Sequence, residues 1–212
     1  MPRLKTAIAY INQLCSSPHM ENRQLGLKLK AQYATWVRTL SLQDFVIFNE
    51  TIEKNKAQIG AAQFFGKFRA YAFEEYVYRL LQSKIRIPET LQLFWGEKCL
   101  VWEKDDKRYA MEFDVSIGKW KDYFVEPKTV FDVKIELDSA RLKTALASFA
   151  ILKEQNRKVK CVLVYAFKEL DPVLLELAMR WADGIFQFSL ENDERASFLR
   201  CVAECLEERK VS

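Results

Sequence analysis

The strongest constraint on the fold is a change in sequence pattern near Pro88. Residues 3 to 83 carry apolar side chains at three- and four-residue spacing, which is typical of amphipathic helices. After Pro88 the chain consists of short aromatic and β-branched segments, interrupted by turn residues such as Gly96 and Gly118. We expect these segments to be strands joined by tight turns. The pattern therefore predicts a helical first part followed by a sheet.

The second half of the chain alternates expected strands and helices. The expected order is strands at 91–97, 98–104, 108–118 and 123–131, a helix at 139–158, a strand at 159–167, a helix at 171–183, a strand at 184–190 and a helix at 193–210. This order predicts an α/β fold in which a mixed β-sheet is flanked by helices. We divide the chain into an all-helical N-terminal extension, 1–60, packed on an α/β core, 61–212.

The chain has a single histidine, His19, among its 212 residues. Histidine-dependent nucleases, zinc hydrolases and Ser-His-Asp hydrolases are difficult to build with one imidazole. Catalysis is therefore expected to rest on carboxylates, lysine and a hard metal ion such as Mg²⁺. The net charge of +4 permits a polyanionic partner but does not demand one.

The lengths of the apolar segments and the number of cysteines indicate the cellular compartment in which the chain is expected. No run of eighteen or more apolar residues occurs, so no membrane span is expected. The five cysteines are odd in number and form no Cys-X-X-Cys pair, and reduced thiols fit a cytoplasmic setting.

The stretch "GAAQFFGKF" has a superficial similarity to a phosphate-binding loop. A Walker A motif needs four residues between its glycines and Ser or Thr after the lysine, whereas five separate Gly60 from Gly66 and Phe68 follows Lys67. We therefore expect no nucleotide cofactor.

Two acid-X-lysine triplets lie close together in "YFVEPKTVFDVKIEL". They are Glu126-Pro127-Lys128 and Asp132-Val133-Lys134. The acid and lysine of such a triplet point to the same face of a strand. Alone, each triplet is equally compatible with a solvated strand face, because isolated charges are common on surfaces.

Hairpin register favours the first triplet. A turn centred near residue 120 places Asp114 opposite Glu126, so that both carboxylates can reach one metal ion. Lys128 then lies on the same face. Asp132 and Lys134 compete for this role if residues 119 to 128 form a long loop instead of a tight turn. Pro127 argues against a regular central strand, since proline cannot donate to the ladder.

Several segments together resemble the PD-(D/E)XK nuclease superfamily, and their spacing is similar to that of its archaeal Holliday-junction resolvase branch. The matching segments are "FEEYVYRLL", "EFDVSIG", "FVEPKTV" and, after a helix, "CVLVYAF", within roughly residues 66 to 170. The chain length and helical extension resemble nucleases of spindle-shaped archaeal viruses, which would place the protein in the host-cell cytoplasm. Two departures from the family pattern are Phe113 before the aspartate and Pro127 inside the triplet.

The resemblance implies a restriction-endonuclease-like fold, Mg²⁺ that Mn²⁺ can replace, branched or duplex DNA as substrate, and a homodimer. It also implies a glutamate on the preceding helix, either Glu74 or Glu75. Glu74 lies at the edge of the apolar stripe of that helix and Glu75 on its solvent side, so we choose Glu74. The aromatic surplus of residues 60 to 81, with Trp95 and Trp102, is expected to supply a dimer interface.

Two function hypotheses follow. In the first, the chain is a metal-dependent DNA endonuclease in which Asp114, Glu126 and Glu74 hold the metal and Lys128 stabilises developing charge. In the second, it is a catalytically inactive DNA-binding or assembly module on a nuclease scaffold. An intact acid-acid-lysine set in the folded protein favours the first hypothesis, and a broken set favours the second.

Overall fold

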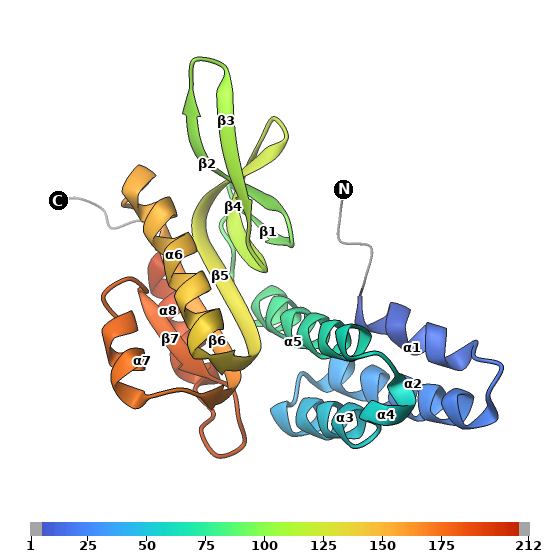
Figure 1. The fold of residues 1–212 in the computed structure, drawn as a ribbon. Coiled ribbons are helices and arrows are strands. Elements are labelled where there is room, and N and C mark those ends of the chain that lie inside the picture. Colours follow the sequence, from blue (N-terminus) through green and yellow to red (C-terminus); the bar gives the residue numbers. More distant parts are fainter. Residues whose placement is uncertain (1–5, 208–212) are drawn as a thin grey trace.

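The computed structural model describes residues 6–207. Its first part is a group of helices and its second a mixed sheet flanked by helices, as the sequence pattern predicts (Figure 1). The helices of the first part are α1 (Ala7–Cys15), α2 (Met20–Thr39), α3 (Leu42–Lys54), α4 (Lys56–Ile59) and α5 (Ala62–Lys84). Among the described residues, no helix has the length and apolar character needed to cross a membrane.

Capping residues define where the helices begin. Ser41 lies directly before α3, and its hydroxyl accepts a hydrogen bond from the Asp44 amide at 3.3 Å. Asp171 and Pro172 begin helix α7 (Pro172–Ala178), with the Asp171 carboxylate accepting from the Val173 amide. Both starts were expected from the sequence, because a side-chain oxygen at this position satisfies an otherwise unpaired amide.

The sheet contains seven strands in mixed orientation. They are β1 (Gln92–Trp95), β2 (Lys98–Lys104), β3 (Lys107–Glu112), β4 (Val115–Lys121), β5 (Phe124–Asp138), β6 (Lys160–Glu169) and β7 (Gly184–Gln187). Strand β5 is the longest and lies at the centre: it pairs antiparallel with β4, parallel with β6, and parallel with β2 through Val125. This strand therefore connects all parts of the sheet, and the hairpin of β2 and β3 projects from it (Figure 1).

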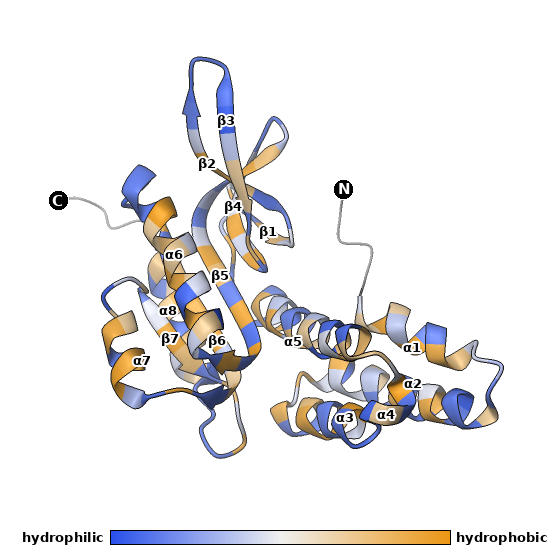
Figure 2. Cartoon of the chain, viewed as in Figure 1, coloured by the Kyte–Doolittle hydropathy of each residue, from blue (hydrophilic) through white to orange (hydrophobic). Residues whose placement is uncertain are grey.

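Helices cover both faces of the sheet and enclose two apolar cores. The first core joins α1–α3 and α5 to one sheet face and to α8 (Arg195–Leu206), and the second joins α6 (Ser139–Gln155) and α7 to the other face. Figure 2 shows hydrophobic and hydrophilic segments alternating along α1–α5, as expected for helices that each bury one face.

Helix α5 contributes to the first core along most of its length. Phe68, Phe73 and Tyr76 are fully enclosed, and Tyr76 and Phe73 pack against Phe45 of α3. Burying one such ring stabilises the fold by about 2–3 kcal/mol. These rings of α5 are therefore packed inside the chain and are not available to the dimer interface that the sequence suggested, whereas Trp102 of β2 is exposed.

The β4–β5 hairpin differs from the predicted one in its turn. The turn consists of Asp122 and Tyr123, between the paired residues Lys121 and Phe124, and Asp122 adopts a left-handed backbone (φ 54°). Aspartate tolerates this conformation better than most residues. Gly118, which looked like a turn residue, lies inside β4 and is buried.

The predicted pairing of Asp114 with Glu126 is wrong as a consequence. Glu126 lies opposite Lys119, whereas Val115 lies opposite Phe131, so Asp114 meets the strand beside Asp132. The later turn accounts for most of the shift, and a β-bulge next to Gly118 adds a further residue on β5. Pro127 lies at this bulge, which is one of the few places where a sheet accepts proline.

Candidate active site

Asp114 lies immediately before β4 and reaches the free edge of β5. Its Oδ2 atom accepts a hydrogen bond from the Val133 amide at 2.8 Å and a second from Lys134 Nζ at 3.0 Å. β4 begins at Val115, opposite Phe131, so this part of β5 has no β4 partner and its backbone is open to a side chain. The carboxylate of Asp114 therefore takes the place of a neighbouring strand.

Asp132 and Lys134 extend from the same face of β5. Their Oδ1 and Nζ atoms are 2.6 Å apart, so Lys134 Nζ is paired with Asp132 and with Asp114 together. The side chains are 15% and 25% exposed, and that of Asp114 is 13% exposed. The second triplet, which register reasoning left as the alternative, is thus the one that meets Asp114.

The protonation of this cluster is set by burial and by charge. Burial raises the pKa of Asp132 to about 6, and the neighbouring Asp114 carboxylate adds to this, against the opposing charge of Lys134. Burial lowers the pKa of Lys134, but the two carboxylates outweigh it and raise that pKa above its ordinary value. Lys134 is therefore a fixed cation at neutral pH.

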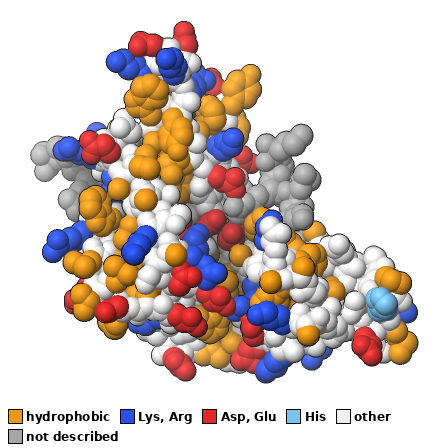
Figure 3. Space-filling view, viewed as in Figure 1, with side chains coloured by type: hydrophobic (Ala, Val, Ile, Leu, Met, Phe, Trp, Pro, Cys, Tyr) orange, Lys and Arg blue, Asp and Glu red, His pale blue; other side chains and the backbone are white. Residues whose placement is uncertain are grey.

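Glu74 of α5 faces the same region. It is 5% exposed, accepts a hydrogen bond from Trp95 Nε1 at 3.3 Å, and lines a cavity of about 350 Å³ together with Lys134. Acidic and basic side chains gather along the junction of the helical part and the sheet, on the face shown in Figure 3. This position agrees with the choice of Glu74 as the inward carboxylate of the helix.

Glu75 is not on the solvent side as expected. It is 1% exposed and lies against α2, where its Oε1 accepts hydrogen bonds from Tyr33 at 2.6 Å and from Arg79 at 2.8 Å. These contacts give Glu75 a structural task in joining α2 to α5.

A second charged group borders the cavity and was not recognised from the sequence. Arg69 of α5 is buried, and its guanidinium contacts Glu136 at 2.5 Å, Glu53 at 2.8 Å and Asn49 at 3.1 Å. Glu136 follows Lys134 by two residues on β5 and so shares its face. Arg69 thereby connects α3 and α5 to the strand that carries the cluster. The position of Arg69 in the sequence of α5 did not indicate that it belongs to a charged site.

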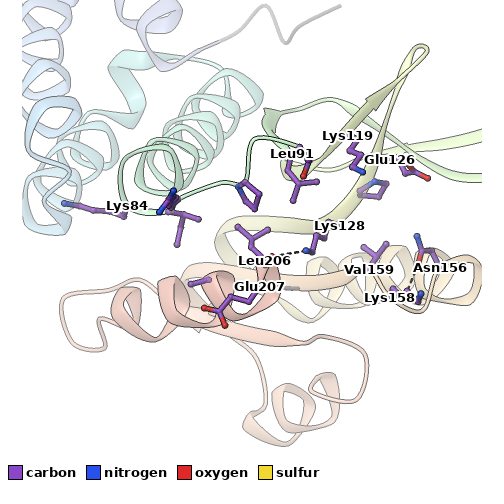
Figure 4. Close-up of a pocket in the computed structure, with 16 residues that line it drawn as sticks. Lys84, Leu91, Lys119, Glu126, Lys128, Asn156, Lys158, Val159, Leu206 and Glu207 are labelled. Carbon is purple, nitrogen blue, oxygen red and sulfur yellow. Dashed lines mark hydrogen bonds between the residues drawn. The ribbon is translucent and has the colours of Figure 1, made fainter. Parts of the chain in front are cut away.

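Glu126 and Lys128 lie elsewhere. Both line a different and larger groove, about 930 Å³ in volume, at the other end of β5 (Figure 4). Lys128 Nζ donates to the backbone carbonyl of Leu206 at 2.9 Å. The structure therefore does not bring Glu126 and Lys128 together with Asp114.

The donor set is compatible with a hard divalent cation. Mg²⁺ is commonly held by one or two carboxylates, with water and substrate phosphate completing its shell. Asp114 and Asp132 supply two such carboxylates. Asp132 Oδ1 is a buried atom whose one contact in residues 6–207 is the ion pair with Lys134; it has no other hydrogen-bond partner there. No group of three or more Asp, Glu, His or Cys side chains converges on one metal position in that range. The site thus offers a carboxylate pair, with Glu74 further from it.

Comparison with known proteins supports the fold. No protein-family model matches the chain, and no curated protein matches its sequence. The structure is similar to a chain of the native A2B2 tetramer of BbvCI, a restriction endonuclease with the PD-(D/E)XK fold, with a TM-score of 0.58 and 9% sequence identity. The match covers 94% of this chain and 93% of that chain. The restriction-endonuclease-like α/β fold expected from the sequence is therefore confirmed.

Proposed function

We propose that this chain is a metal-dependent DNA endonuclease whose active site consists of Asp114, Asp132 and Lys134, with Glu74 beside them. The observation that carries the proposal is the contact of Lys134 Nζ with both carboxylates, at 3.0 Å and 2.6 Å. A lysine between two partly buried acids is expensive to maintain for stability alone, and such clusters are concentrated at functional sites. The restriction-endonuclease-like fold supports the same reaction class by analogy.

The chain's own residues have distinct tasks in this proposal. Lys134 stays protonated at neutral pH and can donate to a phosphate oxygen, where it stabilises the negative charge that develops as water attacks phosphorus. The Val133 amide and Lys134 ammonium fix the orientation of the Asp114 carboxylate. Arg69 holds Glu136 at the border of the cavity, which keeps the end of β5 in place.

Asp114 and Asp132 would hold Mg²⁺, for which Mn²⁺ can substitute. When bound, the metal supplies Lewis-acid polarisation of the phosphate and lowers the pKa of a bound water. Glu74 is close enough to Lys134 to line the same cavity, and we assign it the orientation of water or of the substrate phosphate.

The proposed substrate is DNA with branched structure, as in the resolvase branch, and the proposed assembly is a homodimer. Two scissile strands require two active sites, which a twofold dimer supplies. Exposed apolar side chains on and after α7 support an interface there: Val173, Leu177, Met179 and Trp181 are between 46% and 60% exposed. Light scattering at micromolar concentration should give twice the chain mass. A single-chain mass would reject the dimer and leave the active site unaffected.

The test of function is cleavage of a labelled four-way junction and of its matched duplex, with Mg²⁺ or Mn²⁺. We expect cleavage that is abolished in Asp114→Asn and unaffected in Glu126→Gln, because Glu126 lies in the other groove. The two substitutions remove the same charge. DNA binding without cleavage under either metal would instead identify the chain as an inactive module on this scaffold.

A further inference from the structure

The larger groove is formed by four segments that are distant in sequence. They are the connection from α5 to β1, the β4–β5 pair near its bulge, the loop between α6 and β6, and the end of α8. Lys84, Lys119, Lys128 and Lys158 come from three of these segments, with Lys119 and Lys128 both on the β4–β5 pair (Figure 4). The groove is separate from the cavity beside Lys134, and no lining residue is shared between the two.

The charge of the groove is predominantly positive. Five cations line it, the four lysines and Arg86, against the two carboxylates of Glu126 and Glu207. Lys84, Arg86, Lys119 and Lys158 are exposed, and within residues 6–207 none of the four forms an ion pair. By contrast, Lys134 beside the acidic cluster is neutralised by two carboxylates. The groove therefore presents a net positive charge to a partner.

The bulge in β5 gives this groove a fixed wall. It turns Lys128 toward α8, where Nζ donates to the Leu206 carbonyl at 2.9 Å. This bond uses one of the carbonyls that every helix leaves unpaired at its end, and it ties α8 to the strand. A groove with cations on several walls suits a polyanion of regular charge spacing, and the bond from Lys128 to α8 holds two of these walls together.

We propose that this groove binds the sugar-phosphate backbone of DNA, at a segment distant from the phosphate that is cut. This proposal rests on the proposed nuclease function and deepens it. Lys128 and Lys134 are six residues apart on β5, which is roughly 20 Å at 3.3 Å per residue. One strand of a duplex advances 3.4 Å per base pair, so the groove is reached by arms that extend at least about six base pairs from the cut.

The experiment measures DNA affinity in EDTA, where no cleavage occurs, by fluorescence anisotropy across a range of salt concentrations. The groove variant combines Arg86→Ala, Lys119→Ala and Lys158→Ala, which remove exposed cations without breaking an ion pair. The control variant combines Lys30→Ala, Lys168→Ala and Arg180→Ala, which have the same composition, are also exposed, and lie outside the groove.

For junctions with arms of about 16 base pairs, we expect the groove variant to lose about tenfold or more in affinity and to reduce the salt slope by about 2–3. The control should change both by much less, and arms of about four base pairs should remove the difference between the variants. Equal losses of DNA affinity in the two variants, or no loss in the groove variant, would overturn the proposal that the groove binds DNA. Absence of DNA binding by the unmodified chain would instead reject the proposed function, so the two failures are distinguishable.

Discussion

The two ends of strand β5 carry similar residues in different surroundings. Toward its C-terminal end, Asp132 and Lys134 are partly buried and meet Asp114. Toward its N-terminal end, Glu126 is exposed and Lys128 turns away at a bulge to bind the end of α8. Whether an acid-X-lysine triplet forms a charged site therefore depends on the residues opposite it in the hairpin. The residue types of the triplet itself do not distinguish Asp132–Lys134 from Glu126–Lys128.

The difference also separates two tasks that nucleic-acid enzymes must combine. The acidic cluster has its lysine charge compensated and is suited to holding a cation and a single phosphate. The basic groove has a net positive charge and is suited to binding a polyanion without cleaving it. The comparison predicts that substitutions at one end of β5 change rate and those at the other change affinity or stability.

The largest expected effect is on catalytic rate. Lys134→Ala should reduce the cleavage rate by about a hundredfold or more, because a cation positioned at the developing charge contributes about 3 kcal/mol to lowering the barrier. Lys128→Ala should leave the rate within about twofold, since its ammonium group faces α8. Single-turnover cleavage at saturating protein measures both.

The same pair of variants can contradict the comparison directly. Full activity in Lys134→Ala combined with inactive Lys128→Ala would show that the groove is the catalytic centre. Circular dichroism of each variant is the control, because removing Lys134 leaves the Asp114 and Asp132 carboxylates facing each other without their shared cation.

The second prediction concerns the bulge that divides the two ends. A Cβ atom at Gly118 would lie 2.2 Å from the Glu126 carbonyl oxygen and 2.9 Å from Pro127 Cα, both backbone atoms that cannot move independently. Gly118→Ala should therefore destabilise the protein by about 2–3 kcal/mol in urea unfolding.

Gly66→Ala is the matched control for Gly118→Ala. Gly66 lies in α5 with nothing within 4 Å of an added Cβ, so alanine should be neutral or stabilising by up to about 1 kcal/mol. Similar stability of the two variants would mean that β4 and β5 are not in close contact at Gly118, which would also remove the basis for the observed register.

Most of the fold could be predicted from the sequence, because periodicity reports directly on helices and strands. The change from helices to strands near Pro88, the start of α3 at Ser41 and the start of α7 at Asp171 all follow from local pattern and capping chemistry. The single strand expected at 108–118 is wrong: the chain breaks there into β3, which pairs with β2, and β4, which pairs with β1 and β5. The helix carboxylate facing the cavity, Glu74, followed from the apolar stripe of α5. The burial of Glu75 could not be predicted in this way. It depends on contact with Tyr33 of α2, and the apolar stripe of α5 does not indicate how α2 packs against it.

The strand residue that lies opposite Asp114 could not be predicted reliably from the sequence. The register of a hairpin changes with each residue by which its turn is misplaced. Gly118 suggests a turn by its residue type. In the structure it lies inside β4, where the absence of a Cβ atom lets the Glu126 carbonyl approach the backbone. Two local signals pointed the other way. Asp122 is a residue type that tolerates the left-handed turn conformation, and Pro127 is a residue type that a regular central strand excludes. Together they indicate a later turn and a bulge.

The third prediction concerns pH and the acidic end of β5. With a pKa of about 6 in the metal-free protein, Asp132 is protonated below pH 6 and charged above it. A metal ligand must be deprotonated, so Mn²⁺ affinity should fall by up to about tenfold per pH unit below 6. Calorimetric titrations between pH 5 and pH 7.5 measure this.

Asp132→Asn separates this carboxylate from the others. The variant should bind Mn²⁺ weakly and without the dependence centred near pH 6, whereas Glu126→Gln should bind as the unmodified chain does. Constant affinity down to pH 5 in the unmodified chain would show that Asp132 does not control metal binding, and would leave Asp114 as the principal ligand.

The smallest expected effect is on stability at the basic end of β5. Lys128→Ala removes the hydrogen bond from Nζ to the Leu206 carbonyl, and a bond of this kind contributes about 1 kcal/mol. The loss is limited because the carbonyl borders an open groove, where water can replace the ammonium group. Lys119→Ala in the same groove breaks no ion pair and should change stability by less than about 0.5 kcal/mol. Urea unfolding measures both variants, and a larger loss of stability in Lys128→Ala than in Lys119→Ala would show that Lys128 fixes α8 to the strand. If instead the two variants lost the same stability, the bond from Lys128 to α8 would contribute nothing, and the bulge would serve only to direct positive charge into the groove.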